Sequence, residues 1–327
     1  MRICVYGAGS IGGNFATRLA AAGNEVSVVV RGAHLQAIRA NGLTLLTGER
    51  KIVMPVKASD RPVDLGPQDA VLVTMKSSSQ HVLPDAIGPL LHADTMVAFV
   101  QNGIPWWYGH GLGARPAAPD LSQLDPGGAL ARAIGLERTV GAVVTSSNHV
   151  MAPGVVRNVS PERNVLWVAE TDDRQSPRIL ALRQTLIAAG IASPATTDIR
   201  YDIWHKLMAN LCGSALCLIL REPTTVLGDP VVNPLARRAH EEALAIAAAH
   251  GVVLDDSPEQ RFGPQRVYPD HRPSILQDYE LGRPMEIESI VRAPVAFARK
   301  AGIATPTLDA VEAICVRLAA AKGLYTA

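Results

Sequence analysis

A lysine and an asparagine interrupt a long stretch of small and apolar residues beyond the middle of the chain. The residues from Ile199 to Leu220 are predicted to form a helix, on which Lys206 lies one turn before Asn210. A lysine that is partly desolvated against a cofactor can have its pKa lowered towards the range in which it donates a proton to a carbonyl oxygen as hydride arrives. We interpret Lys206 as a candidate general acid, with a solvated surface lysine as the alternative. The residues expected to share its face are Asn210, Gly213, Ser214 and Cys217.

Polar side chains also occur on two predicted helices later in the chain. Glu286 and Glu288 lie on the helix predicted from Met285 to Ala301, and Ser274 and Asp278 are one turn apart on the helix before it. Each of these side chains could bind a substrate. Each could equally be a helix cap or part of a solvated face, and this applies to Ser274 in particular.

The segment from Gly7 to Gly12 has the pattern GxGxxG, directly after a predicted strand and at the start of a predicted helix. In this context Gly7 permits a tight turn, Gly9 lets backbone N–H groups approach a pyrophosphate, and Gly12 lets the helix pack closely on the strand. The motif predicts a dinucleotide site, with a glycine-rich turn that binds nothing as the alternative. The candidate contacts to the cofactor are Gly7, Gly9, Ser10, Ile11 and Gly12.

The second predicted strand, Val26 to Val30, is followed by Arg31 where an NAD site would usually have an acidic residue. A guanidinium cannot accept hydrogen bonds from a ribose 2′-OH, but it suits the dianion of a 2′-phosphate. Arg31 therefore favours NADP(H) over NAD(H), with a solvated surface arginine as the alternative.

Two more polar residues follow predicted strands of the same sheet. Lys76 ends the run Ala70 to Met75, and Asn102 follows the run Met96 to Val100. Because ligands of open α/β sheets bind beyond the carboxyl ends of the strands, either residue could reach a nicotinamide or a bound anion. A polar residue after a strand is also common in ordinary loops.

Short β-branched runs alternate with amphipathic stretches in the first third of the chain, which is typical of βαβ units. Shorter alternating runs between Val140 and Ala169 predict antiparallel strands appended to the same sheet. We expect an α/β fold whose domain of residues 1–197 contains a doubly wound, mostly parallel sheet of the Rossmann type.

Strand signals stop at about Asp198, and long helical patterns follow. We expect residues 198–327 to form a second, all-helical domain. Pro294 should kink one of its helices. The Gly- and Pro-rich stretch from Gly109 to Gly128 predicts a long mobile loop.

Composition limits the partners and the location of the protein. The 327 residues carry 31 basic and 30 acidic side chains with no basic block, so the electrostatic footprint for nucleic acid or anionic lipid is missing. We expect a small-molecule partner and no membrane, while the sequence leaves a homodimer open. The four cysteines lack metal-ligand spacing, which predicts buried thiols, no metal site and a reducing compartment. With no leader segment and no apolar run of about 18 residues, we expect a cytoplasmic protein.

Taken in order, the motifs resemble those of the ketopantoate reductase (2-dehydropantoate 2-reductase) family over nearly the whole chain. The matching segments are GAGSIGG, Arg31, VTMKS, QNG, IWHKLMAN, SILQDYELGRPMEIE and GIATPTLD. The resemblance implies a Rossmann domain with a helical domain and NADPH as hydride donor. It also implies reduction of a 2-oxo acid to a 2-hydroxy acid in the cleft between the domains, as in pantothenate biosynthesis.

The resemblance also implies roles for individual residues. Lys206 matches the general acid, and Glu286 matches the carboxylate that binds the substrate hydroxyl and helps to orient the lysine. The other matches are Asn102 and Ser274 at substrate-contacting positions, Asn210 as a polar wall residue, and Lys76 near the nicotinamide.

Some residues depart from the family pattern. Ser214 stands where a second asparagine is common, and Val291-Arg292 stands where an Asn-Gly pair is common. Because unpaired buried groups affect specificity strongly, the substrate could be a different 2-oxo acid or ketone. Trp106 and Trp107 could line a pocket for a bulkier substrate, or could simply hold the loop that follows. A non-catalytic NADP(H) sensor is the alternative from another class, although Lys206 and Glu286 argue against it.

Overall fold

The computed structural model describes residues 1–263, 268 and 270–326, and these residues form two compact units. The first unit contains residues 1–76, 80–101 and 127–199, and the second contains residues 77–79, 102–126 and the chain from Arg200 onwards. The predicted domains, 1–197 and 198–327, stay a prediction. The compact units follow the same division within two residues, apart from the two short segments that join the second unit.

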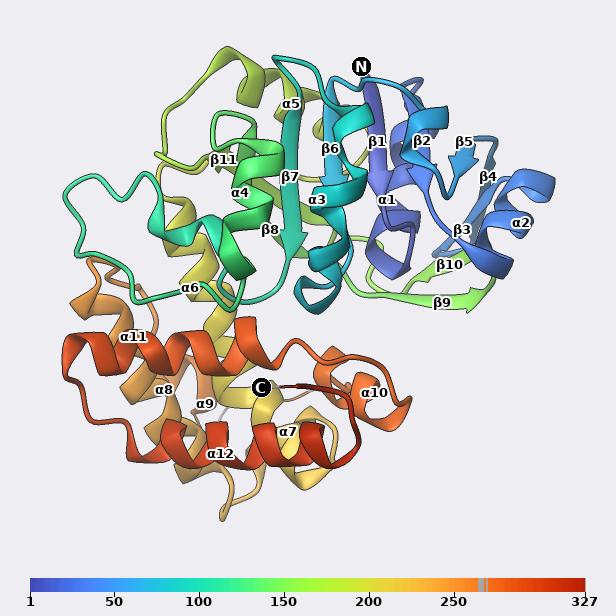
Figure 1. Cartoon of the computed structure of the whole chain (residues 1–327). Helices are drawn as coiled ribbons and strands as arrows, with labels where there is room; N and C mark the ends of the chain where they lie inside the picture. The colour runs from blue at the N-terminus through green and yellow to red at the C-terminus, as the bar shows by residue number, and fades with distance from the viewer. Residues whose placement is uncertain (264–267, 269, 327) are drawn as a thin grey trace. The chain divides into compact units, whose positions relative to one another are not determined.

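A seven-stranded sheet forms the centre of the first unit, in the order β11-β8-β7-β6-β1-β2-β5 (Figure 1). All neighbours are parallel except β11, which is antiparallel to β8. Strand order reverses direction at β1, which lies between β2 and β6, so β1 and β6 form the topological switch point of a doubly wound sheet. The predicted fold class is confirmed. The strands are β1 (Arg2–Tyr6), β2 (Glu25–Val29), β5 (Lys57–Ser59), β6 (Ala70–Val73), β7 (Met96–Gln101), β8 (Thr139–Thr145) and β11 (Val165–Glu170).

A second, four-stranded sheet has the order β4-β3-β10-β9. The prediction that all strands between Val140 and Ala169 extend the main sheet was wrong for two of them. β9 and β10 form an antiparallel hairpin that pairs instead with β3, which is distant in sequence. No local pattern encodes such a long-range pairing. The strands are β3 (Leu43–Thr47), β4 (Arg50–Met54), β9 (Asn148–Ala152) and β10 (Val155–Asn158).

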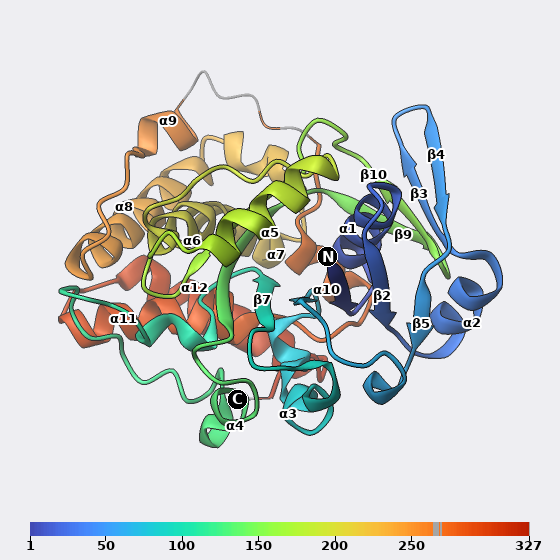
Figure 2. The same cartoon turned by 90° about the horizontal axis from the view of Figure 1, so that it is seen from above.

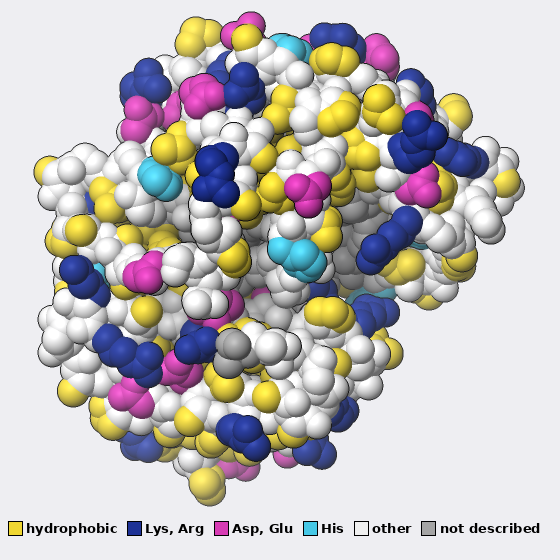
Figure 3. Space-filling view, viewed as in Figure 1, with side chains coloured by type: hydrophobic (Ala, Val, Ile, Leu, Met, Phe, Trp, Pro, Cys, Tyr) yellow, Lys and Arg dark blue, Asp and Glu magenta, His cyan; other side chains and the backbone are white. Residues whose placement is uncertain are grey.

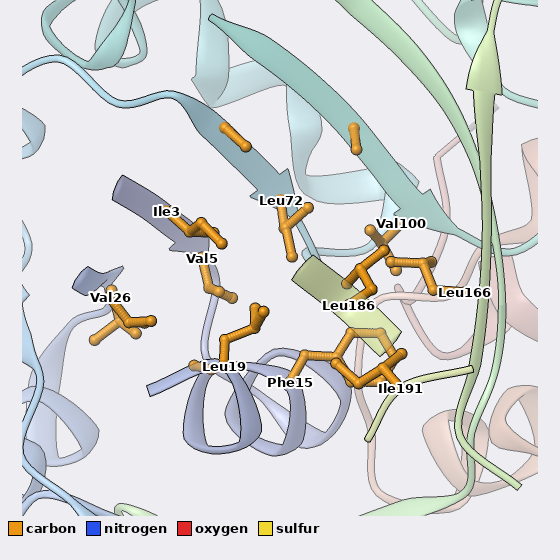
Figure 4. Packing of buried hydrophobic residues seen from close by; sticks show 14 of the residues in the cluster. Ile3, Val5, Phe15, Leu19, Val26, Leu72, Val100, Leu166, Leu186 and Ile191 are labelled. Carbon is orange, nitrogen blue, oxygen red and sulfur yellow. The ribbon is translucent and has the colours of Figure 1, made fainter. Parts of the chain in front are cut away.

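Helices cover both faces of the main sheet, with α1 and α5 on one face and α3 and α4 on the other (Figures 1 and 2). The covered strands are continuous apolar runs because both of their faces are buried. Figure 4 shows the core beneath α1 and α5, where Phe15 and Leu19 lie near Leu186 and strand residues such as Leu72. The helices are α1 (Ser10–Ala21), α2 (Gly32–Asn41), α3 (Leu83–Ala86), α4 (Ala129–Ile134) and α5 (Pro177–Ala188).

The regular structure of the second unit is helical, as predicted, since its described residues contain helices, turns and loops but no strand. Two of its helices are interrupted by π-helical turns, one at Asn210–Ser214 and one at Glu288–Arg292, which ends two residues before Pro294. The interruption expected at Pro294 therefore takes the form of a π turn. The helices are α6 (Ile199–Ala209), α7 (Ala215–Leu220), α8 (Asn233–Ala249), α9 (Pro258–Phe262), α10 (Ser274–Glu280), α11 (Ala293–Ala301) and α12 (Pro306–Ala321). Short 3₁₀ turns lie at Pro62–Asp64, Ser77–Val82, Gly88–Leu90, Trp106–Gly109, Pro126–Gly128 and Thr224–Gly228.

The start of the loop at 102–126 is fixed to α6 by a buried arginine. Arg200 is fully buried, and its guanidinium donates to the carbonyl oxygen of Tyr108 at 3.0 Å and lies over the ring of Trp107 at 5.6 Å. Trp204 donates from Nε1 to the Tyr108 hydroxyl at 2.7 Å. Trp106 and Trp107 are both buried, so the structure supports their role in holding the loop.

The structure also bears on metal and membrane binding. The four cysteines are free and buried, and burial raises the pKa of Cys4 to about 12, so the predicted buried thiols are confirmed. Among the described residues, no three His, Cys, Asp or Glu side chains are grouped to hold a metal ion. One helical stretch in this part of the chain, Ile199–Leu220, has the length and apolarity to cross a membrane, but 61% of its apolar window is buried inside the protein, as in a core helix.

Charged side chains are mixed in sign on the face of the molecule seen in Figure 3, where Lys and Arg are interspersed with Asp and Glu.

Candidate functional site

The glycine turn lies at the switch point of the main sheet and is bonded to the strands on either side. The Gly7 N–H donates at 3.0 Å to the carbonyl oxygen of Val29, the last residue of β2, and the hydroxyl of Thr74, the residue after β6, donates to the Gly7 carbonyl oxygen. Gly7 has a φ of +97°, which L side chains rarely adopt. The turn is therefore fixed at the position where doubly wound sheets bind their ligands.

The N-terminus of α1 presents backbone donors at this turn. The first intrahelical bond joins the Gly13 N–H to the Gly9 carbonyl oxygen at 2.8 Å, so the N–H groups of Ser10, Ile11 and Gly12 come before the hydrogen-bonded ladder. No side chain among the described residues caps this end of the helix. Donors of this kind, together with the helix dipole, favour a bound anion such as a pyrophosphate.

Arg31 and Lys76 both lie at this edge of the first unit. Arg31 is exposed and lies two residues beyond Val29, whose carbonyl oxygen accepts from Gly7. Lys76 is half-buried and lies two residues beyond Thr74, whose hydroxyl bonds the same turn. The parallel register of β2, β1 and β6 therefore brings both cations to the edge at which a nucleotide would bind.

A π turn at Asn210–Ser214 affects which of the later residues share a face of the helix with Lys206. The Ser214 hydroxyl donates to the Ala209 carbonyl oxygen, five residues earlier, at 3.4 Å. The wider turn keeps Ser214 in line with Lys206 and Asn210, and all three side chains are half-buried. Gly213 and Cys217, which were expected on the same face, are buried instead. The expected face was wrong for these two residues because it assumed regular α-helical spacing. π turns inside α-helices are frequent at functional sites.

Glu286 is buried and is held by Ser77, which is bonded in turn to Ser289, and the sequence analysis singled out neither serine. It lies just before the helix that begins at Ile287, and not within a helix that begins at Met285 as predicted. The Ser77 N–H donates to Glu286 Oε1 at 3.0 Å and the Ser77 hydroxyl donates to the same oxygen at 3.2 Å. The hydroxyls of Ser77 and Ser289 are 2.9 Å apart. These bonds fix one oxygen of the carboxylate and therefore its orientation.

Asn102 is brought to the same part of the second unit by close packing of the residues after it. The Ile104 N–H donates to the Ser289 carbonyl oxygen at 2.8 Å. A Cβ on Gly103 would lie only 2.4 Å from that oxygen, so this approach requires glycine. Residues 77, 102–104 and 286–289 thus meet around Glu286, and Asn102 is half-buried beside them in the chain.

Arg292 takes part in an ion-pair network with the end of the chain. It donates to Glu288 at 3.1 Å and to the Tyr325 hydroxyl at 2.8 Å, and the Tyr325 hydroxyl donates to Glu288. The hydrogen bond with Tyr325 and the charge of Glu288 raise the pKa of Arg292, while burial and the bond to Glu288 raise the pKa of Tyr325 to about 12. Glu288 and Arg292 are therefore structural here. The Tyr325 contact has no signal in the sequence.

Ser274 is exposed at the first residue of α10, where it makes no capping bond because Pro273 occupies the cap position. The capping alternative is therefore wrong for Ser274, and its role in substrate binding stays a prediction. The predicted contacts of Asn102, Asn210 and Ser214 with substrate stay predictions in the same way.

The doubly wound sheet with a glycine turn at its switch point defines a dinucleotide-binding protein with an additional helical unit. Comparison with known proteins identifies its family. Residues 3–170 match the family described as ketopantoate reductase PanE/ApbA, and residues 198–317 match the C-terminal family of the same proteins. The chain belongs to the ketopantoate reductase family, whose members are oxidoreductases.

Individual relatives resemble the chain over its whole length. It is 39% identical to a 2-dehydropantoate 2-reductase from Mesorhizobium japonicum, with 100% of both chains covered. The crystal structure of a 2-dehydropantoate 2-reductase from Geobacter metallireducens matches with a TM-score of 0.83 at 27% identity and covers 97% of this chain and 99% of the other. D-mandelate dehydrogenase, solved with NADH and anilino(oxo)acetate, matches with a TM-score of 0.80 at 21% identity and 98% and 99% coverage, which shows a shared fold.

Proposed function

We propose that this protein reduces a 2-oxo acid, 2-dehydropantoate or a close analogue, to the corresponding 2-hydroxy acid with NADPH as the hydride donor. The observation that carries the proposal is full-length similarity at 39% identity to a 2-dehydropantoate 2-reductase. The glycine turn at the switch point and the half-buried Lys206 supply the chemistry that this reaction needs. In this role the enzyme serves pantothenate biosynthesis.

The first unit binds the cofactor. The pyrophosphate is held at the turn of Gly7 and Gly9 by the N–H groups of Ser10, Ile11 and Gly12, because these three donors start α1 without a partner in the helical ladder. Arg31 pairs with the 2′-phosphate, and Lys76 lies near the nicotinamide. Asn102, which belongs to the second unit, is a further contact to the cofactor. When bound, NADPH supplies the hydride.

The second unit supplies the acid and the substrate contacts. Lys206 donates a hydrogen bond to the ketone oxygen, polarises the carbonyl and delivers the proton. Glu286 orients this lysine and accepts a hydrogen bond from the nascent hydroxyl. Its orientation is fixed because the N–H and the hydroxyl of Ser77 both donate to one carboxylate oxygen, and the Ser289 hydroxyl is bonded in turn to that of Ser77. The substrate carboxylate and the remaining polar atoms are met by Ser274, Asn102, Asn210 and Ser214.

The reaction is tested by the decrease in NADPH absorbance with a panel of carbonyl compounds. We expect 2-dehydropantoate, or a 2-oxo acid of similar size, to give the highest kcat/KM in the panel. A simple ketone without a carboxylate should be a poor substrate, because it cannot use the carboxylate contacts. Tight NADPH binding without oxidation by any carbonyl compound would contradict the proposed reaction.

A reductase of a different 2-oxo acid is the second candidate function. It is favoured by Ser214 and by Val291-Arg292, which replace residues common in the family. Serine has a shorter side chain than asparagine and lacks the amide, so different substrate oxygens would be paired. Under this alternative a larger 2-oxo acid is preferred over 2-dehydropantoate in the same panel. Activity with any 2-oxo acid also separates both candidates from a sensor that only binds NADP(H).

The place and assembly of the enzyme follow from the same proposal. We propose that it acts in the cytoplasm, where the four free, buried thiols stay reduced, and on a small molecule as its partner. A homodimer is the assembly to test, by light scattering of the purified protein.

Substitution of Arg31 by alanine should raise KM for NADPH by about 10- to 100-fold, because a charge-assisted hydrogen bond contributes about 1.5–3 kcal/mol. KM for NADH should change little, since NADH has no 2′-phosphate. Steady-state titration with both nucleotides measures the difference. Arg157→Ala, at another exposed arginine of the first unit, is the control and should leave both KM values unchanged. An unaltered preference in Arg31→Ala would remove the assignment.

A further inference from the structure

A histidine that the proposed function does not use bridges the glycine turn and a second loop. His34 lies in the first turn of α2, and its ring is half-buried. His34 Nε2 lies 2.6 Å from the carbonyl oxygen of Ala8, inside the GxGxxG segment. On the other side of the ring, the Gly154 N–H donates to His34 Nδ1 at 2.9 Å. Both ring nitrogens are therefore engaged with backbone groups of the first unit.

These contacts determine the tautomer of the ring. A backbone N–H can only donate, so Nδ1 accepts from Gly154 and carries no proton. Nε2 then carries the proton of the neutral imidazole and donates it to the Ala8 oxygen, which can only accept. The ring thus bridges one acceptor and one donor without a mismatch.

The far end of the bridge is itself fixed. Gly154 is buried, and its carbonyl oxygen accepts from the Thr44 N–H of β3 at 2.9 Å. His34 therefore connects the turn after β1 to the β3 and β10 strands of the second sheet, and does not merely fill space between two mobile loops.

The near end of the bridge matters for anion binding. The Ala8 carbonyl oxygen and the Gly9 N–H belong to one planar peptide group, so fixing the oxygen also fixes the N–H. The Gly9 N–H donates to the Gly7 carbonyl oxygen at 2.9 Å, which closes the turn. A carbonyl oxygen released from this arrangement could turn towards a bound pyrophosphate and repel it.

We propose that His34 is a positioning residue for the dinucleotide. It holds the Ala8-Gly9 peptide so that the start of α1 meets the pyrophosphate with N–H donors and not with a carbonyl oxygen. The inference rests on the proposed function, in which this turn binds the cofactor. Because the pyrophosphate is common to NADPH and NADH, His34 acts on the binding of both nucleotides, in contrast to Arg31.

The test compares His34→Leu, which removes both polar contacts, with His34→Gln, which keeps a donor and an acceptor. The control is Gln36→Leu, at an exposed position of the same helix. Kd for each nucleotide is measured by fluorescence titration, together with kcat and KM for the oxo acid at saturating NADPH and the Tm of each variant. We expect His34→Leu to raise Kd for NADPH and for NADH about tenfold each, with kcat within about twofold of wild type. His34→Gln should recover part of this loss, and Gln36→Leu should bind as wild type does.

Other outcomes distinguish a failure of the role inferred for His34 from a failure of the proposed function. Unchanged Kd values in His34→Leu, with or without a lower Tm, would overturn the inference and leave the proposed function in place. A loss confined to NADPH would also overturn it, because the ring would then contact the 2′-phosphate directly. If His34→Leu fails to fold, the same readings on His34→Gln decide, since wild-type Kd values together with a lowered Tm would assign the residue to stability alone. Failure of the wild-type protein to bind either nucleotide would instead overturn the proposed function.

Discussion

Substitution of Lys206 by alanine is expected to lower kcat by about 10²- to 10⁴-fold, the usual contribution of a positioned general acid. Without the ammonium group, the ketone oxygen gains negative charge as hydride arrives and has no donor to neutralise it. Kd for NADPH should stay close to that of wild type, because the glycine turn and Arg31 belong to the first unit. Stopped-flow measurement of NADPH oxidation under saturating conditions gives kcat, and fluorescence titration gives Kd.

The neighbouring residue offers a matched control for this loss. His205 is exposed on the same helix and stacks on Tyr201, with the ring centroids 6.0 Å apart, so His205→Ala alters the helix surface without removing the acid. It should retain kcat within about threefold, since surface substitutions of this kind change free energies by about 0.5 kcal/mol. Near-native turnover in Lys206→Ala would assign the proton to another group and remove the proposed role.

Substitution of Gly12 by alanine is expected to destabilise the first unit strongly. The added Cβ would lie 2.3 Å from the Gly7 carbonyl oxygen and 2.4 Å from Thr74 Oγ1, distances that real Cβ atoms do not show. The first contact is backbone, so the turn or the helix must move. Overpacking of this kind costs about 3 kcal/mol, which corresponds to a decrease in Tm of about 10 °C for a unit of this size. Thermal unfolding followed by circular dichroism measures the decrease.

Gly9 provides the contrasting substitution in the same turn. A Cβ there would have nothing within 4 Å, and the φ of Gly9 is −72°, so Gly9→Ala should keep the wild-type Tm. If the open space is where the pyrophosphate lies, Gly9→Ala should nevertheless raise Kd for NADPH at least tenfold, because the methyl group occupies the approach to the helix N-terminus. Wild-type binding by Gly9→Ala would contradict the assignment of the turn, and a wild-type Tm for Gly12→Ala would contradict the packing argument.

The position of Glu286 shows how the candidate site is assembled from distant parts of the chain. The carboxylate accepts from Ser77, whose hydroxyl is bonded to that of Ser289, and Gly103 must lack a side chain for its loop to reach the Ser289 carbonyl oxygen. Ser77 belongs with the second unit although the residue before it, Lys76, belongs with the first. The orientation proposed for Lys206 therefore depends on a contact between Ser77 and Glu286, which are more than 200 positions apart in the sequence.

The sequence by itself determined the features that depend on local pattern. The GxGxxG segment, the apolar strands before Thr74 and Asn102, and the change to helices after Asp198 were all readable, because strand and helix periods and glycine turns are properties of neighbouring residues. The same patterns, in this order, were sufficient to indicate the family. The predicted roles of Lys206, Glu286 and Arg31 rest on these local patterns and on the family that they indicate.

Only the tertiary structure decided the features that depend on long-range contact. β9 and β10 lie outside the main sheet because β10 pairs with β3, which is more than 100 residues away in the sequence. The hydrogen bonds from Ser77 to Glu286 and from His34 to Ala8 also join residues that are not neighbours in the sequence. The π turn at Asn210–Ser214 is a further case, since regular helical spacing placed Gly213 and Cys217 on the wrong face. Periodicity specifies which side of an element is apolar, but the partner that covers it is selected by packing among all the elements at once.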